Sequence, residues 1–429
     1  MQDNPLKLEI ATLGECRIPS PISGRAFVHD REHVLYHSDL TEIKAFLEAG
    51  QDPPGFETGG PRARIYFDPS KLKCGIVTCG GLCPGLNDVI RAIVLSLYHH
   101  YGAKTVFGFR YGYEGLSSKY GHPPLELTPQ MVTRIHEMGG TILGSSRGDQ
   151  DVPDMVDTLE QMNIGILFTI GGDGTLRGAH AIVEEIKRRG LKIAIIGIPK
   201  TIDNDIAYVQ TSFGFQTATS EARRVTYSAH SEAEGSRNGI GLVKLMGRES
   251  GFIAAYACLA DSQVNFCLVP EVPFTLEKFL GALRERLERR SHAVIVVGEG
   301  AGQELIGENR GRDASGNIRF GDIGIFLREQ IRAYFAQAGM EINLKYIDPS
   351  YTIRSLPANA FDSAFCLLLG HNAVHAGMAG RTDMVVSTWK NFFTHAPIPL
   401  AVSKRKKIEP HGWLWNSVLA ATGQPADLR

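Results

Sequence analysis

The residues best suited to chemistry lie in the polar sequence PKTIDND at residues 199–205. An ammonium, a hydroxyl and two carboxylates come from Lys200, Thr201, Asp203 and Asp205. Such groups can take a proton from a hydroxyl and offset the charge of a transferring anionic group. The apolar run 193–198 directly before them is typical of a strand buried on both faces of a parallel sheet. We expect a ligand at this carboxyl end; the alternative is a polar loop with Asx turns at Asp203 and Asn204.

Two glycine-rich turns follow other predicted strands. GGLCPGLN (80–87) follows a strand at 74–79, and GGDGT (171–175) follows a strand at 165–170. A strand, a glycine turn and a helix start point backbone N–H groups and the helix dipole at a phosphate. GGLCPGLN is neither a P-loop nor a G-x-G-x-x-G fingerprint. Asp173 offers Mg²⁺ a hard oxygen ligand beside such phosphates; the alternative is that it caps the next helix.

Strands and helices alternate along the remaining chain, which predicts an α/β fold with parallel sheets and right-handed crossovers. The helix after GGLCPGLN has Asn87 as its expected N-cap and Gly102 as its stop. A loop is expected at 302–317. Further strands are expected at 105–109, 240–245, 265–269, 293–297, 341–347 and 382–388, and helices at 128–139, 175–189, 217–230, 250–259, 276–290, 323–338 and 359–375.

Composition excludes several classes of protein. The chain has 429 residues and a net charge of −1, so it carries no bulk field for nucleic acid or an anionic membrane. No apolar run approaches the ~20 residues of a membrane span. Seven scattered cysteines indicate reduced thiols, and the first residues do not form a secretory signal, so a cytoplasmic protein is expected. The basic run 404–407 is interpreted as a solvated face without function, and 1–70 as an extension with one helix near 38–49 and a loose linker.

Five motifs in order, GGLCPGLN, GGDGT, PKTIDND, MGRESG and YIDPSYTIR, resemble those of the 6-phosphofructokinases over about residues 70–400. GGDG alone would also suit NAD kinases and diacylglycerol kinases. The resemblance implies two Rossmann-like three-layer α/β/α lobes with mostly parallel sheets. It assigns an N-terminal extension (1–70), a nucleotide-binding lobe (71–213, completed by about 353–400), a sugar-phosphate-binding lobe (214–352) and a C-terminal segment (401–429).

The resemblance also implies residue roles. Asp203 would be the general base, supported by Lys200, Thr201 and Asp205, and Asp173 would bind Mg²⁺. The nucleotide site would be formed by Gly81, Arg147, Gly148, Gly172, Asp173, Gly174 and Thr175. The fructose 6-phosphate site would be formed by Thr201, Ile202, Asp203, Met246, Gly247, Arg248, Glu299, Tyr351 and Arg354.

Two positions bear on the phosphoryl donor. Pyrophosphate users in the family typically have Asp where this chain has Gly174, and Lys where it has Lys200; short bacterial ATP enzymes have Gly at both. A carboxylate at 174 would crowd and repel the α-phosphate of ATP. The combination of Gly174 with Lys200 resembles the long ATP-dependent enzymes of this family. The expected activity is therefore ATP-dependent phosphorylation of fructose 6-phosphate in glycolysis.

Three alternatives remain open. They are a pyrophosphate-dependent enzyme, a kinase of a related sugar such as sedoheptulose 7-phosphate, and a non-catalytic sugar-phosphate-binding regulator. The resemblance further implies an allosteric homodimer or homotetramer. Gly239, Tyr351 and Lys345 replace residues of the short enzymes' pattern, so the subunit-shared site of those enzymes is not transferred to this chain.

Overall fold

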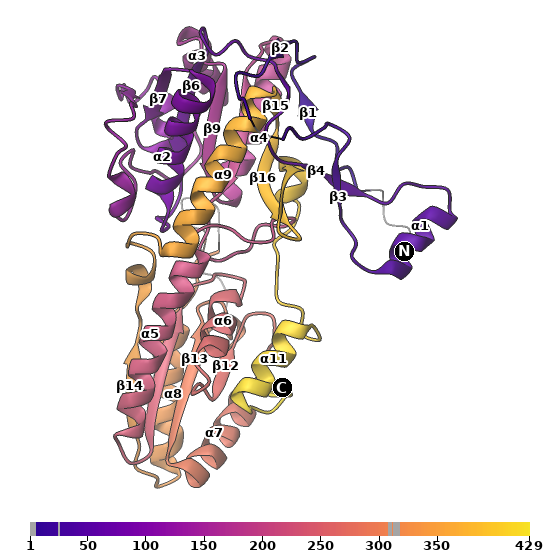
Figure 1. Ribbon diagram of the computed structural model, residues 1–429. Helices are drawn as coiled ribbons and strands as arrows, with labels where there is room; N and C mark the ends of the chain where they lie inside the picture. The colour runs from indigo at the N-terminus through magenta and orange to yellow at the C-terminus, as the bar shows by residue number, and fades with distance from the viewer. Residues whose placement is uncertain (1–5, 25, 308–310, 312–317) are drawn as a thin grey trace. The chain divides into compact units, whose positions relative to one another are not determined.

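The computed structural model describes residues 6–24, 26–307, 311 and 318–429, so part of the predicted loop 302–317 lies outside the described residues. The chain divides into two compact units (Figure 1). Unit 1 comprises Met1–Thr201, Ile206–Gly214 and Leu356–Arg405, and unit 2 comprises Ile202–Asp205, Phe215–Ser355 and Lys406–Arg429. The chain passes between the units several times, and its first boundary falls inside PKTIDND, between Thr201 and Ile202.

Unit 1 is built on a nine-stranded sheet in which β16, β10, β9, β6 and β7 are parallel neighbours. Antiparallel strands extend it at both edges. In spatial order the strands are β3 (His33–Leu35), β4 (Gly55–Thr58), β17 (Phe392–Pro397), β16 (Met384–Trp389), β10 (Ala194–Pro199), β9 (Ile166–Gly171), β6 (Lys73–Thr78), β7 (Thr105–Phe109) and β8 (Leu125–Glu126).

The central strands are buried on both faces, as the apolar run before PKTIDND predicts. Every residue of β9 and β10 is buried. Pro199 pairs with Gly171, and Ile170 pairs with Thr78, so β10, β9 and β6 end at the same edge of the sheet. The turns that follow these strands are therefore neighbours.

Helices cover both faces of this sheet. The apolar stripe of α4, including Leu176, Ile182 and Ile186, packs with α3 on the face that includes Leu167 and Ile195. On the other face α2 and α9 pack closely together, and α9 also contacts β10. The α-helices of unit 1 are α1 (Leu40–Glu48), which has no buried residue, α2 (Leu86–Ser96), α3 (Val152–Gln161), α4 (Asp173–Arg189), α9 (Ala360–Met378) and α10 (Ile398–Ala401).

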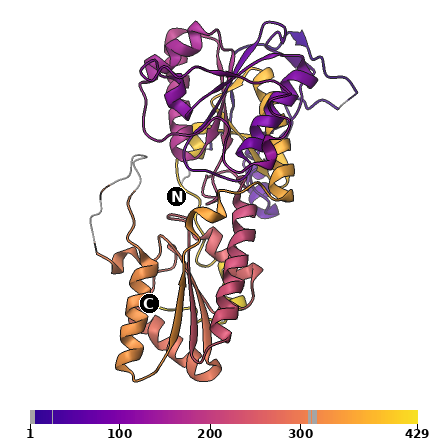
Figure 2. The same cartoon turned by 90° about the vertical axis from the view of Figure 1, so that its left-hand side faces the viewer.

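Unit 2 has a four-stranded, fully parallel sheet in the order β12 (Phe266–Leu268), β13 (His292–Gly298), β11 (Gly239–Leu245) and β14 (Asn343–Ile347). Figure 2 shows α5 on one side of this sheet and α8 on the other. A continuous apolar core joins α7 and α8 to the sheet. The helices are α5 (Phe215–Glu234), α6 (Phe252–Ala260), α7 (Leu276–Arg290), α8 (Ile323–Gln337) and α11 (Trp413–Thr422). Both units are three-layer α/β/α structures, which confirms the predicted fold class.

Two local predictions are wrong. Asn87 lies inside α2 rather than at its N-cap, which is Gly85, because its side chain donates to the Met138 carbonyl and accepts from the Ile142 amide. The helix predicted at 128–139 is a series of turns ending in a 3₁₀ segment, Ile135–Glu137. Tertiary contacts outweigh local propensity at both places. The stop at Gly102 is confirmed, since this residue adopts the left-handed conformation.

The N-terminal 70 residues are more than a helix and a loose linker. They supply β3 and β4, and Glu57 on β4 accepts hydrogen bonds from Arg62, Arg381 and His395. Asp30 accepts from both arginines as well. Burial alone would raise the pKa of Glu57, but the hydrogen bond and charge of His395, together with Arg381, lower it to about 2. A buried ionic network thus attaches this segment to the main sheet.

All seven cysteines are free thiols, as predicted, and all except Cys16 are buried. Within the described part of the chain, no helix is long and apolar enough to cross a membrane.

Candidate active site

In unit 1 the predicted nucleotide residues lie in the turns after β6 and β9 and in the segment before α3, and Lys200 follows the neighbouring strand β10. Gly80 adopts a φ of +84°, and a side chain there would approach the Lys200 ammonium within 3.1 Å, so glycine suits this position. The Ser145 hydroxyl donates to the Gly80 carbonyl at 2.6 Å, and the Gly80 amide donates to Ser146. These bonds hold the segment carrying Arg147 and Gly148 against the Gly80–Gly81 turn. Arg147 itself is exposed.

Lys200 links these turns. Its side chain is only 5% exposed, and Nζ donates to the Gly81 carbonyl at 2.7 Å. Its backbone amide donates to the Gly171 carbonyl at 2.9 Å. A buried ammonium therefore lies beneath two glycine turns, where it can offset the charge of a bound phosphate chain.

Asp173 is the first residue of α4 and does not cap that helix, because Gly172 is the N-cap. Its carboxylate accepts from the Arg177 guanidinium one turn later, at 3.1 and 3.3 Å. Among the described residues, no side chain caps the first-turn N–H groups of α4, so they are directed at the position where an anion would bind.

Gly174, the second residue of α4, borders open space. A Cβ built there would meet no described atom within 4 Å beyond its chain neighbours and its own helix backbone. Thr175 is buried and its carbonyl accepts from the Tyr113 hydroxyl, which fixes the first turn of the helix. Gly174 can thus accept a larger side chain without a clash inside unit 1.

In unit 2 the predicted sugar-phosphate residues other than Ile202 and Asp203 follow β11, β13 and β14, three adjacent parallel strands. The Arg248 amide donates to Glu299 Oε1 at 2.9 Å, which joins the turns after β11 and β13. Gly247 has a φ of +144°, and a Cβ there would lie 2.5 Å from the Ser250 carbonyl oxygen, so this turn requires glycine. Met246 and Arg248 are partly buried on either side of it.

A 3₁₀ segment, Ser350–Ile353, follows β14. Tyr351 lies in this segment and Arg354 directly after it. The Arg354 guanidinium carbon lies 4.8 Å from the centroid of the Tyr351 ring, a cation–π contact that limits its positions. Lys244 on β11 pairs with Asp348 at 2.8 Å and Asp322 at 2.9 Å, and thereby anchors the start of this segment.

The loop Ile202–Asp205 of unit 2 carries the predicted base. Asp203 is partly exposed, whereas Ile202, Asn204 and Asp205 are buried. A residue that no sequence pattern singled out contacts this loop. Lys406 Nζ donates to Asn204 Oδ1 at 3.0 Å, and the Lys406 amide donates to the Asp205 carbonyl at 2.8 Å. Interpreting the whole basic run 404–407 as a solvated face is therefore wrong for Lys406.

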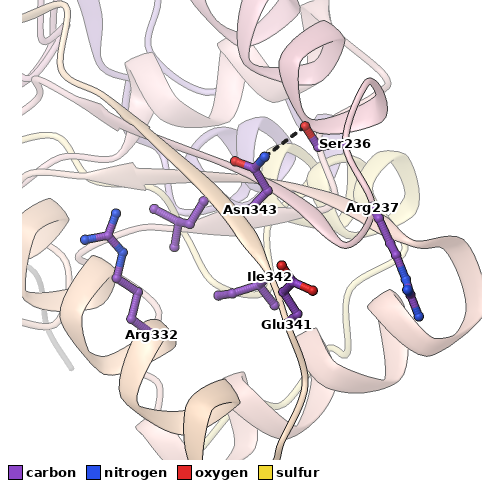
Figure 3. A pocket seen from close by; sticks show the side chains of 7 residues that line it. Ser236, Arg237, Arg332, Glu341, Ile342 and Asn343 are labelled. Atoms are coloured by element: carbon purple, nitrogen blue, oxygen red, sulfur yellow. Dashed lines mark hydrogen bonds between the residues drawn. The ribbon is translucent and has the colours of Figure 1, made fainter.

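Two other polar groupings are separate from these turns. A cavity of about 430 Å³ lies at the amino ends of β11 and β14, the opposite end of the unit 2 sheet (Figure 3). Its arginines, Arg237 and Arg332, point away from each other in Figure 3 and do not converge on one anion. In unit 1, one group of three potential metal ligands is found among the described residues, near the amino end of β16: His180, Glu184 and Asp383.

Glycine turns and arginines at the carboxyl ends of parallel strands, repeated in two α/β units, define a class of proteins that bind phosphorylated ligands at such edges. The sequence model described as Phosphofructokinase matches residues 73–377, and the chain belongs to this family. It is 46% identical to the ATP-dependent 6-phosphofructokinase of Borreliella burgdorferi, over 100% of this chain and 99% of the relative. It is 48% identical to the ATP-dependent 6-phosphofructokinase of Amycolatopsis methanolica, over 98% of this chain and 95% of the relative.

A solved structure shares the fold. The crystal structure of a pyrophosphate-dependent phosphofructokinase from Marinobacter aquaeolei matches with a TM-score of 0.67 and 20% identity. The match covers 83% of this chain and 93% of that one. At this identity the likeness concerns the fold alone.

Proposed function

We propose that the protein is an ATP-dependent 6-phosphofructokinase, which transfers the γ-phosphate of ATP to the 1-hydroxyl of fructose 6-phosphate. The observation that carries the proposal is the set of turns around Lys200, Asp173 and Gly174 in a chain 46% identical, along its whole length, to an enzyme of that name. The arginine turns of unit 2 suit the second substrate.

Proton removal is assigned to Asp203. A primary hydroxyl must lose its proton as it attacks phosphorus, and a carboxylate within hydrogen-bond reach performs this in phosphoryl transfer. Asp203 suits the role because it is partly exposed on a loop whose neighbours are buried. Fixed neighbours keep the base in place while its carboxylate stays accessible to substrate. Thr201 and Asp205 would support the geometry of the loop.

The phosphate chain of ATP is assigned to the turns of unit 1. Backbone amides at the start of α4 and the buried Lys200 would bind its oxygens, and the exposed Arg147 can move to reach them. Asp173 fits Mg²⁺, because a carboxylate beside phosphate oxygens is the usual magnesium arrangement. The ion pair of Asp173 with the largely exposed Arg177 contributes about 0–1 kcal/mol, so replacing Arg177 by Mg²⁺ as the partner of Asp173 would cost little free energy. When bound, Mg²⁺ would offset negative charge on the phosphates.

The 6-phosphate and hydroxyls of the sugar are assigned to unit 2. A guanidinium binds phosphate through paired N–H donors, which suits Arg248 and Arg354. Glu299 holds the Arg248 backbone and can accept from a sugar hydroxyl. Met246 and Gly247 would shape the same turn around the ligand.

The donor is tested by a coupled assay of the purified protein with ATP and with pyrophosphate, each with fructose 6-phosphate and with sedoheptulose 7-phosphate. We expect turnover with ATP and fructose 6-phosphate. Turnover with pyrophosphate alone would reverse the assignment of the donor. Binding of sugar phosphate without turnover by either donor would favour a regulator.

We also propose, from family resemblance, that the enzyme requires Mg²⁺, is an allosteric homodimer or homotetramer and works in the cytoplasm. Light scattering after size-exclusion chromatography would give the oligomeric state. A titration of activity with Mg²⁺ in metal-free buffer would test the metal requirement, with no dependence on added metal as the contradicting result.

A further inference from the structure

We infer that Lys406 is a positioning residue for phosphoryl transfer, acting through Asn204 on the loop that carries Asp203. This inference rests on the proposed function, and it assigns a role within unit 2 to a segment near the C-terminus. Lys406 makes contacts through its side chain and through its backbone, and Glu271 holds the segment that follows it.

The first contact is made by the side chain. Nζ of Lys406 donates to Asn204 Oδ1 at 3.0 Å and lies 5.4 Å from the centroid of the Phe252 ring at the start of α6. Asn204 has a φ of +53°, in the left-handed region, so the residue next to Asp203 holds a backbone conformation that L-residues seldom adopt. A side-chain bond at that residue restrains the conformation and, with it, the direction of the neighbouring carboxylate.

The second kind of contact is made by the backbone. The Lys406 amide donates to the Asp205 carbonyl at 2.8 Å, and the Lys406 carbonyl accepts from the Ser250 hydroxyl at 2.8 Å. Ser250 belongs to the MGRESG turn that contains Arg248. One residue therefore bonds to both the Asp203 loop and the Arg248 turn.

A separate pair of hydrogen bonds holds the segment that follows Lys406. Glu271 Oε1 accepts from the Ile408 amide at 2.9 Å and from the Gly251 amide at 3.0 Å. Gly251 is the N-cap of α6, so Glu271 joins the segment after Lys406 to the start of that helix. Lys406 is thus held on a fixed backbone and can transmit that fixed position to Asn204.

Neighbouring lysines do not share these contacts. The Lys407 side chain is 53% exposed, and its ion pair with Glu249 is long at 3.9 Å. Lys407→Met is therefore a matched control for Lys406→Met, because both remove one lysine from the same run. The backbone contacts of residue 406 are retained in Lys406→Met, so the variant tests the side-chain bond.

The experiment compares kcat and KM for both substrates in wild type, Lys406→Met and Lys407→Met, with thermal unfolding as the check on folding. We expect Lys406→Met to lower kcat at least tenfold, with KM for ATP unchanged, while Lys407→Met matches wild type. A misplacement of about 1 Å at a reacting group can lower the rate about 100-fold, so this range is reasonable. Equal kcat in the two variants would overturn the inference, whereas an inactive wild type would overturn the proposed function instead.

A double-mutant cycle separates positioning from a general structural role. Asn204→Gly removes the acceptor while tolerating the positive φ. If Lys406 acts through Asn204, adding Lys406→Met to Asn204→Gly lowers kcat by less than twofold more. Full multiplication of the two single losses would show that Lys406 acts elsewhere and would refute the inference. If either variant is poorly folded, the cycle is run with Lys406→Gln and Asn204→Ser, and the kcat of the double variant is again compared with those of the two single variants.

Discussion

Replacing Gly174 with Asp tests the assignment of the donor most directly. Gly174 is the second residue of α4, and a Cβ there meets open space, so the substitution introduces a carboxylate without a clash in unit 1. An acidic residue in the first helical turn stabilises the helix by about 0.3–1 kcal/mol, and loss of glycine adds about 0.4–1 kcal/mol. We therefore expect the variant to fold at least as stably as wild type.

The effect on ATP should be large. Two like charges about 4 Å apart repel by about 4 kcal/mol at an effective dielectric constant of about 20. Because about 1.4 kcal/mol corresponds to a factor of ten, kcat/KM for ATP should fall by about two to three orders of magnitude. Pyrophosphate has only two phosphates and places none where the α-phosphate of ATP would lie. Any basal turnover with pyrophosphate should therefore stay unchanged or rise in Gly174→Asp.

The assay measures kcat/KM for ATP in wild type, Gly174→Asp and Gly174→Ala at fixed saturating Mg²⁺ and fructose 6-phosphate. Alanine fills the same open space without charge and should remain within about threefold of wild type. If alanine loses as much activity as aspartate, shape rather than charge excludes ATP. If aspartate keeps the wild-type value, the reasoning about this position is wrong.

Three further outcomes are expected. Asp203→Asn should lower kcat by about 10²–10⁴ with little change in KM for ATP; a kcat within threefold of wild type would remove Asp203 from the role of base. Glu57→Gln should lower the free energy of unfolding by about 1–3 kcal/mol at pH 7, because buried Arg62 and Arg381 lose a charged acceptor although Asp30 still accepts from both. Chemical denaturation would measure this loss. Burial lowers the pKa of Lys406 to about 7 against the attraction of Asp205. The ordinary pKa of a lysine is 10.5. Between pH 7 and pH 9 the free energy of unfolding of wild type should therefore rise by up to about 2 kcal/mol relative to that of Lys406→Met, as measured by chemical denaturation at each pH.

The two pH effects have definite signs. A lowered carboxyl pKa stabilises the folded state above the ordinary value of 4.5, and this contribution is lost as the pH falls toward about 2. The deficit of Glu57→Gln should therefore shrink in acid. A lowered lysine pKa means that the unfolded chain binds more protons between about pH 7 and pH 10.5, so stability rises with pH there. A pH-independent difference between wild type and either variant would contradict the corresponding assignment.

The sequence predicts much of the central fold because its strongest patterns are local. The apolar run before PKTIDND identifies β10, and the glycines after β6 and β9 mark turns at the same sheet edge. Helices with clear apolar stripes, such as α7 and α8, are found within a few residues of their predicted bounds.

The remaining features depend on contacts between distant parts of the chain. β4 pairs with β17 more than 300 residues away, so no periodicity in either segment reveals it. Lys406 lies in a run that looks uniformly solvated, and its contact with Asn204 spans 202 positions. Glu271 contacts Ile408 in the same way. Asn87 has the residue type and position of a helix cap in the sequence, but in the structure its side chain accepts a hydrogen bond from the Ile142 amide instead.

The pairing of β4 with β17 has a practical consequence for shortened versions of this protein. A chain begun near residue 70 would lose β3 and β4 and leave β17 as an outermost strand with open N–H and C=O groups. Exposed strand edges recruit further copies by strand addition, so such a truncation should promote self-association. Arg381 would at the same time lose the partners it has in Glu57 and Asp30. The N-terminal segment therefore covers β17 at this edge of the sheet, and shortened versions should keep it.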